Sequence, residues 1–205
     1  MKQRKSLNVL MTLLIIFVMS YQAVENVFHE IAGILLFLLF LIHNILNRKW
    51  YKNILRGKYT RFRILMLTVN ILVWLSMLTA MGTGIYLSRD LFSSLWGMKE
   101  AYLIRPWHVA AGAGGMILVS IHCGIHIRLP AKKNVFWMSG CVIVLAVGIC
   151  SFMALDMPNR LVLRDTGMYW SYSGILLYFA NAAVMALFTG IAASAIRLFI
   201  PFHRG

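Results

Sequence analysis

The sequence is poor in charged residues, above all in acidic ones. Only 13% of its 205 residues are charged, and just six are Asp or Glu. A soluble domain has about 25% charged residues, so this shortage argues against one. With 60% hydrophobic residues, the chain has the composition of an integral membrane protein. The net charge of +14 would suggest nucleic acid as a partner for a soluble protein, but here we expect membrane lipid and no nucleic acid.

Cysteine motifs are also missing. The three cysteines, Cys123, Cys141 and Cys150, lie inside apolar runs, and no C-x-x-C or C-x-x-C-H occurs. This argues against a disulfide framework, a thiolate zinc site and a covalently attached c-type haem. We expect all three to be small, buried, apolar residues.

Long apolar runs make up most of the chain. Six have roughly the length of about 20 residues that a helix needs to cross a bilayer. They cover about 7–24, 27–46, 64–87, 107–127, 135–155 and 169–196. Backbone polar groups cannot stay unpaired in lipid, so these runs should be helices. The sequence therefore predicts an all-α, polytopic membrane helix bundle, with residues 1–205 as one domain.

The first of these runs also has features of a signal peptide. "MKQRKSLNVLMTLLIIFVMSYQA" has a basic start and an apolar centre. Tyr21, however, stands where a small residue is needed before a cleavage site at Ala23. We therefore interpret this run as the first membrane helix.

The charges fall into two sets when the segments between successive spans are assigned to alternate sides of the membrane. One side of the membrane receives 15 basic residues and no acid, including the stretch "NRKWYKNILRGKYTRFR"; the other receives all six acids and the remaining five basic residues. Because cytoplasmic loops carry the excess of Lys and Arg, both termini should be cytoplasmic. Aromatic residues near the span ends would form an interfacial belt: Trp107, Trp137, Tyr169 and Trp170.

Four histidines repeat one spacing on two spans. His29 and His43 are fourteen residues apart in 27–46, and so are His108 and His122 in 107–127. In the predicted topology these two spans are parallel. Fourteen residues are nearly four helical turns, so each pair lies on one face, with about 21 Å between its members. If the two spans face each other, His29 meets His108 near the outer surface and His43 meets His122 near the inner one.

Paired imidazoles on facing helices suit one cofactor in particular. Helix bundles build cofactor sites from side chains on facing helices, and imidazole is a standard axial ligand of haem iron. A lone membrane histidine is most often interfacial, but four matched ionisable residues in apolar spans point to function. The sequence therefore predicts two non-covalent haem b groups, with the four histidines as iron ligands.

Glycine and arginine residues could complete these sites. "HEIAG" and "HVAAG" place Gly33 and Gly112 one turn below the outer histidines, where they would leave room for a macrocycle or allow close helix packing. Haem propionates are anions, and three arginines near the histidines could bind them or could be ordinary positive flanks. These arginines are Arg105 on the outer side and Arg48 and Arg128 on the inner side.

The two remaining histidines and two glutamates are given other roles. His126 lies one turn beyond His122 on nearly the same face, but it would be about 6 Å too deep to pair with His43. We place it at the inner interface, where it could contact a propionate, a quinone or solvent, and we interpret His203 as a surface residue. Glu25 and Glu30 could relay protons if a quinol is oxidised outside, but we interpret them as acids favoured at a helix start.

The histidine-bearing segments also resemble a known family. H-E-x-x-G followed by a second histidine and "HNILNRKWY", over residues 25–52, is similar to the flavinylation-associated membrane cytochromes and, more broadly, to di-haem b-type bacterial membrane cytochromes. The W-H…H element of 107–128 and "MGTGIYLS" in 64–87 fit this resemblance. It implies an electron-transfer protein of the cytoplasmic membrane with His29, His43, His108 and His122 as haem ligands, often working with an extracytoplasmic flavoprotein.

The sequence therefore predicts an electron-transfer subunit and not a stand-alone enzyme. It would pass electrons between a quinone or a cytoplasmic-side donor and an extracytoplasmic redox partner. Two alternatives remain open: a haem-bearing anchor subunit of a quinone-linked dehydrogenase, and a histidine-based metal transporter.

Overall fold

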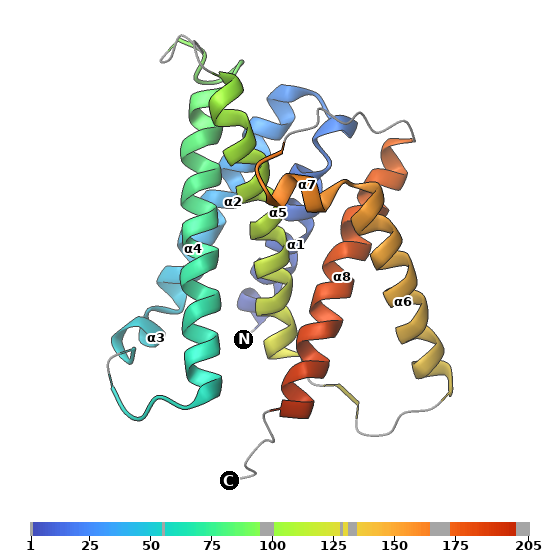
Figure 1. The fold of residues 1–205 in the computed structure, drawn as a ribbon. Helices are drawn as coiled ribbons and strands as arrows, with labels where there is room; N and C mark the ends of the chain where they lie inside the picture. Colours follow the sequence, from blue (N-terminus) through green and yellow to red (C-terminus); the bar gives the residue numbers. More distant parts are fainter. Residues whose placement is uncertain are drawn as a thin grey trace.

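The computed structural model is an all-helical bundle (Figure 1). It describes residues 2–54, 56–94, 101–127, 129–130, 135–164 and 173–199, and no strand occurs among them. The long helices are α1 (Lys2–Met19), α2 (Asn26–Leu46), α4 (Arg61–Leu87), α5 (Ala101–His126), α6 (Val135–Ala154) and α8 (Gly174–Phe199). Three short elements connect them: the 3₁₀ turn η1 (Tyr21–Ala23), α3 (Arg48–Lys52) and α7 (Met157–Leu161).

Five of the six expected membrane spans are confirmed by length and hydropathy. These are α2, α4 and α5 over their full lengths, α6 over Trp137–Ala154 and α8 over Gly174–Arg197. The chain is therefore a multi-pass membrane protein. The first expected span, 7–24, differs because its helix begins at Lys2 and ends at Met19, before the η1 turn. The 18 residues of α1 include Lys2, Arg4 and Lys5, which leaves only a short apolar stretch.

Two further helices differ from their expected bounds at the N-terminal end. α5 begins at Ala101, ahead of the expected 107, and its first turns contain Pro106. α4 begins at Arg61, where the side chain of Thr60 accepts a hydrogen bond from the Arg63 amide and so caps the helix. The expected start of the last span, 169–172, lies outside the described residues.

α5 is the central helix of the bundle. It packs along α4 and α8, whereas α2 packs mainly on α1, touches α4 over a short stretch and is separated from α5 over most of its length. α5 and α8 approach closely at Gly124, where a Cβ atom would lie 2.4 Å from the carbonyl oxygen of Thr189 on α8. Glycine at this position lets the two helix backbones meet, as is common in membrane bundles.

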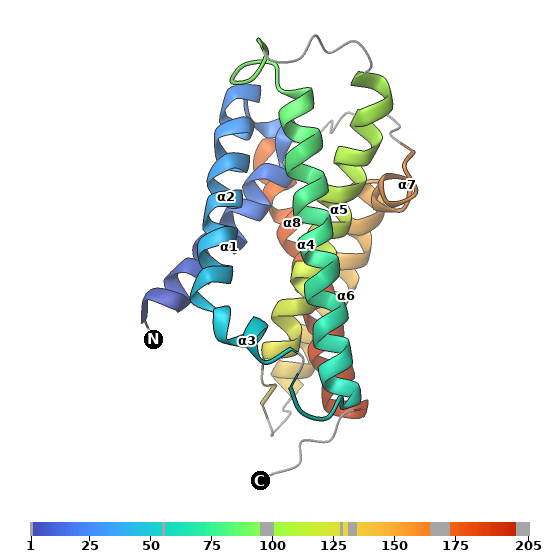
Figure 2. The ribbon, with the colours of Figure 1, turned by 90° about the vertical axis from the view of Figure 1, so that its left-hand side faces the viewer.

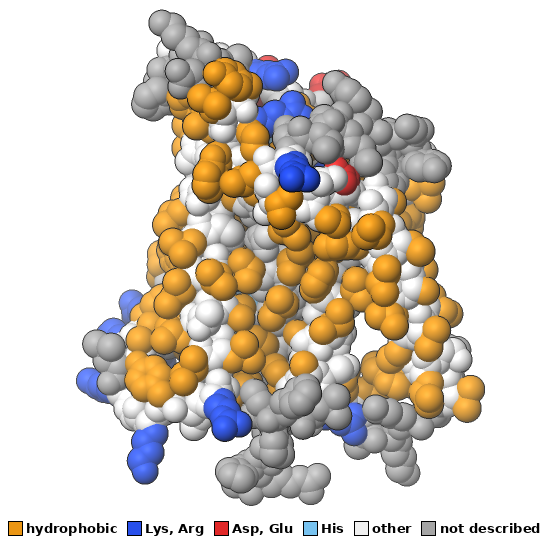
Figure 3. All heavy atoms as spheres, in the orientation of Figure 1, with side chains coloured by type: hydrophobic (Ala, Val, Ile, Leu, Met, Phe, Trp, Pro, Cys, Tyr) orange, Lys and Arg blue, Asp and Glu red, His pale blue; other side chains and the backbone are white. Residues whose placement is uncertain are grey.

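The described charges separate toward the two ends of the bundle. α2, α5 and α8 run from the upper to the lower end in Figures 1 and 2, so the expected parallel arrangement of the histidine-bearing helices α2 and α5 is confirmed. The described acids lie at the upper end: Glu25, Glu30, Asp90 and Asp156. Basic side chains without acids line the lower end of the face in Figure 3.

The expectation that all three cysteines are buried is wrong. Cys123 is half-buried, but Cys141 and Cys150 on α6 are exposed. The reason is that α6 packs against α8 and briefly against α7, so most of its circumference faces outward. In a bilayer these two thiols would face lipid, which accepts them as readily as a core does.

Candidate functional site: a histidine-lined cavity

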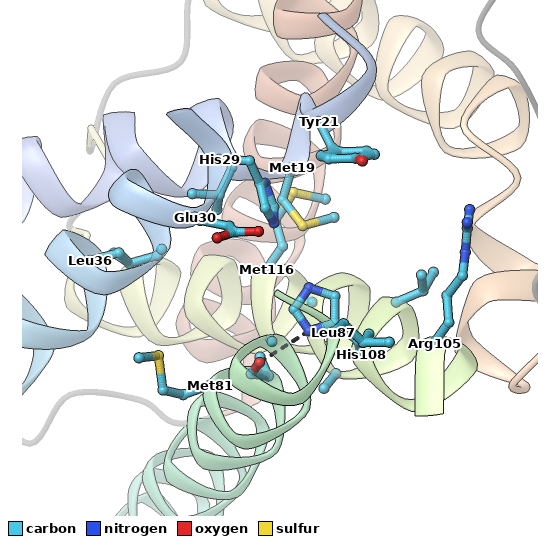
Figure 4. A pocket seen from close by; sticks show the side chains of 18 of the residues that line it. Met19, Tyr21, His29, Glu30, Leu36, Met81, Leu87, Arg105, His108 and Met116 are labelled. Carbon is cyan, nitrogen blue, oxygen red and sulfur yellow. Dashed lines mark hydrogen bonds between the residues drawn. The ribbon is translucent and has the colours of Figure 1, made fainter. Parts of the chain in front are cut away.

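A cavity of about 530 Å³ opens in the upper half of the bundle (Figure 4). This is within the range of about 300–1,000 Å³ typical of cofactor and ligand pockets. Its walls come mainly from α1, α2, α4 and α5, and most of its lining is apolar. The lining includes four of the residues expected from the sequence to form the outer site, two histidines and two glycines: His29, His108, Gly33 and Gly112.

The outer histidine pair meets across this cavity, as expected. The ring centroids of His29 on α2 and His108 on α5 are 6.1 Å apart, with 74° between the ring planes. A metal atom held between two opposed imidazoles, with metal–nitrogen bonds of about 2 Å, separates their centroids by about 6 Å. The measured separation would therefore let His29 and His108 hold one metal atom between them.

The tautomer of His108 follows from its hydrogen bonds. Its Nδ1 lies 3.0 Å from the carbonyl oxygen of Ala80 and 3.1 Å from Oγ1 of Thr83, both on α4. A carbonyl oxygen can only accept, so Nδ1 carries the proton. Nε2 then keeps its lone pair, and metal-ligating histidines are commonly held in this way through their other nitrogen.

His29 has an unpaired buried nitrogen. Its Nδ1 has no hydrogen-bond partner although the atom is buried, and the ring of Tyr21 packs edge-on against the imidazole at 5.0 Å between centroids. Buried polar atoms in proteins are nearly always paired, so an orphan marks a position where a partner belongs. The unpaired Nδ1 of His29 therefore fits a cavity that holds a bound group.

The glycines differ in what they make room for. A Cβ atom at Gly33 would meet nothing within 4 Å, so this side of α2 faces open space. A Cβ at Gly112 would lie 3.4 Å from Sδ of Met19, so the space beside it is already partly filled by α1. Gly84 on α4, which the sequence reasoning missed, lets the His108 ring approach: a Cβ there would lie 3.1 Å from its Cε1.

Arginines lie at the upper part of the same cavity. Arg105 lines it, as expected, and so do Arg89 and Arg160, which the sequence reasoning had placed on this side without a role. Arg48 is exposed at the start of α3 and does not line this cavity. Arg128 lies outside the described residues. Haem propionates would therefore find cations at the upper site.

The inner histidines each have a polar partner on a neighbouring helix, but the described residues show no ring contact between them. Nδ1 of His43 lies 3.1 Å from Oδ1 of Asn8 on α1, and Nδ1 of His122 lies 2.9 Å from Oδ1 of Asn70 on α4. Both imidazoles can thus donate a hydrogen bond through Nδ1, which leaves the lone pair of Nε2 for another partner. No ring contact between them is recorded in the described part of the chain, and the lining of the upper cavity includes neither.

His126 lies directly beside His122 at the lower end of α5. Their ring centroids are 4.9 Å apart at an interplanar angle of 63°. Both His126 and His43 lie within electrostatic range of His122. The three imidazoles therefore belong to one neighbourhood, whereas His203 lies outside the described residues.

Glu30 has a structural role that the sequence did not reveal. Its carboxylate accepts hydrogen bonds from the amides of Arg89, Asp90 and Leu91, at 2.8, 3.3 and 2.9 Å. Ser88 Oγ and Asn26 Nδ2 also donate to it, at 2.7 and 2.6 Å. Glu25 is at the N-cap position of α2, as a helix-start role requires, but its side chain makes no capping hydrogen bond.

Sequence reasoning also missed the polar residues that hold the histidines. Asn8 and Asn70 could have been noticed, because amides are costly in apolar spans and call for a reason. The carbonyl of Ala80 leaves no sequence signal at all. Among the described residues, no group of three or more His, Cys, Asp or Glu side chains is placed to hold a bare metal ion.

Comparisons with protein-family models, with curated proteins and with solved structures found no match for this chain.

Proposed function

We propose that this chain is a di-haem b-type electron-transfer protein of the membrane. His29 and His108 would hold the upper haem, and His43 and His122 the lower one. Haem b, when bound, supplies reversible one-electron chemistry, and the protein contributes axial ligands, burial and nearby charge. The observation that carries the proposal is the 6.1 Å separation of the His29 and His108 rings across one cavity.

The hydrogen bonds of the histidines support the same chemistry. In three of the four imidazoles Nδ1 is engaged by an oxygen atom on a neighbouring helix, from Ala80, Asn8 and Asn70. This fixes ring orientation and leaves Nε2 as the ligating atom. Packing alone does not require such partners for three matched histidines on two parallel helices.

The charge distribution supports an orientation. The lower end, with the basic segment 47–63 and both helical termini, would face the cytoplasm, and the cavity would open toward the outside. Electrons would then pass through the cytoplasmic membrane between a quinone or a cytoplasmic-side donor and an extracytoplasmic redox partner. A flavoprotein is the partner that the sequence resemblance favours.

Visible spectroscopy of the purified chain tests the proposal. We expect a Soret band, α bands that appear on reduction, and about two haems per chain by pyridine haemochrome assay. A folded protein that remains colourless after expression with ample haem contradicts it. The matched variants are His108→Ala, which should remove one haem, and His126→Ala, which should retain both.

A further inference from the structure

The upper ends of α2 and α4 are joined by one carboxylate. α2 has few other contacts with α4, so the hydrogen bonds of Glu30 to residues 88–91 are the main connection between these helices at this end. Three consecutive amides that converge on one anion form a nest, a geometry that holds negative charge well. Hydrogen bonds to an ionised acceptor are about twice as strong as neutral ones.

This connection extends through Asn26 and Tyr21 to His29. Asn26 donates through Nδ2 to Glu30 and also to Asp90 Oδ2, each at 2.6 Å, while its Oδ1 accepts from the Tyr21 hydroxyl at 3.2 Å. Tyr21 in turn packs on the ring of His29. The Ser88 side chain, only 3% exposed, accepts a bond from the Phe92 amide and so closes the turn.

Two residues of the upper site depend directly on this network. His29 precedes Glu30 on α2, so fixing Glu30 fixes the depth and rotation of α2 at the point where His29 faces the cavity. Arg89, whose amide is held by Glu30, lines the same cavity. Among the described residues α2 makes few contacts with α5, so direct packing of these two helices does little to set the distance from His29 to His108.

We infer that Glu30 is a positioning residue: its carboxylate clamps the Ser88–Leu91 turn onto α2, and this clamp sets the His29–His108 separation and holds Arg89 at the cavity. The clamp itself is independent of any cofactor, whereas its consequence for haem binding rests on the proposed function. Glu30 acts through His29 and Arg89 and does not itself ligate.

Hydrogen–deuterium exchange tests the clamp without reference to haem. In the wild-type protein the amides of residues 89–91 should exchange slowly although they lie in an exposed turn. In Glu30→Gln they should exchange at least about tenfold faster, because glutamine offers one neutral acceptor oxygen in place of two charged ones, so each amide loses its hydrogen bond or keeps only a weaker, neutral one. Glu25→Gln is the matched control, since Glu25 is five residues away at the same end and makes no capping bond. Equal exchange in the two variants overturns the inference.

Haem spectroscopy tests the consequence. In Glu30→Gln, the haem that His108→Ala removes should be lost or shifted in midpoint potential, while the other haem and the Glu25→Gln protein stay as in wild type. Ser88→Ala keeps the Glu30 charge and removes one hydrogen-bond donor. It should change the content or midpoint potential of the upper haem in the same direction but by less. This variant replaces Glu30→Gln in the test if Glu30→Gln does not fold. Fast exchange with an unchanged upper haem overturns the positioning role. A colourless wild-type protein instead overturns the proposed function, and the clamp is then decided by exchange alone.

Discussion

Nδ1 of His108 donates a hydrogen bond to the backbone carbonyl of Ala80, one helix away and 3.0 Å distant. A backbone carbonyl cannot be removed by changing a side chain, and it accepts without regard to pH. It therefore holds one tautomer of His108 permanently, with the lone pair of Nε2 available on the other side of the ring. Thr83, at 3.1 Å from the same nitrogen, restricts the ring further.

Replacement of His108 should therefore remove the upper haem alone. We expect His108→Ala to bind about one haem per chain in place of two, because only His29 would remain to hold the upper haem. Haem-to-protein ratio after gel filtration measures this. His43→Ala should also leave one haem, but a different one, with its own potential in a redox titration. If either variant keeps two haems, that histidine is not a ligand.

Asn70 should control the lower site through His122. Its Oδ1 lies 2.9 Å from Nδ1 of His122, and removal of such a supporting partner typically lowers metal affinity by about 10–100-fold. We expect Asn70→Leu to lose the lower haem during dilution or to a haem-binding competitor, while the upper haem stays. Thr68→Leu, two residues away on the opposite, exposed face of the same helix, is the control for a general effect on α4. Equal haem loss in both variants would contradict a specific role for Asn70.

The sequence predicted features that follow from a repeated pattern, but it did not predict contacts between residues far apart in the chain. The fourteen-residue spacing predicted that His29 and His108 face each other, because helix geometry carries a repeat into space without knowledge of packing. It also predicted that His43 meets His122, but no ring contact between these two is found in the part of the chain that the structure describes, because this depends on how the helices pack and on side-chain rotamers. The Glu30 turn was missed because most of its partners are backbone amides 59 to 61 residues away. Every residue except proline has a backbone amide, so the sequence does not mark which amides bind a carboxylate.

The cysteines show the opposite case. Their apolar surroundings were read correctly, but burial was inferred from hydrophobicity, as in a soluble protein. In a membrane bundle apolar residues also cover the outside, so hydrophobicity does not separate core from lipid face. Cys141 and Cys150 are exposed for this reason.

Filling the space beside Gly33 should prevent upper haem binding. A Cβ atom there meets nothing within 4 Å, so Gly33→Leu adds a side chain to the cavity side of α2 without a collision in the fold. We expect the haem content to fall toward one per chain with unchanged helix content by circular dichroism. Gly140→Leu is matched, since Gly140 is also open to 4 Å but lies on α6. Two haems in Gly33→Leu would show that the macrocycle lies elsewhere.

Gly124 should be needed for folding and not for ligation. A Cβ there would lie 2.4 Å from the Thr189 carbonyl oxygen and 2.7 Å from the Ala192 Cβ, so α5 and α8 would have to separate. Overpacking of this kind costs about 1–3 kcal/mol. We expect Gly124→Val to lower the midpoint of thermal or SDS unfolding with parallel loss of both haems. Gly190→Val, at an open position on α8, should unfold like wild type.

The direction of insertion can be tested by thiol labelling of intact cells. In a variant with the three native cysteines replaced by alanine, Ser94→Cys lies in the loop at the upper end and Lys58→Cys lies in the basic segment at the lower end. Because cytoplasmic loops carry the excess of Lys and Arg, Lys58 should be inside. A membrane-impermeant maleimide should therefore label the cysteine at 94 in whole cells and the one at 58 only after permeabilisation. The reverse labelling pattern would mean the opposite orientation in the membrane. The arginine-lined cavity would then face the cytoplasm, and each end of the bundle would face the redox partner expected at the other end.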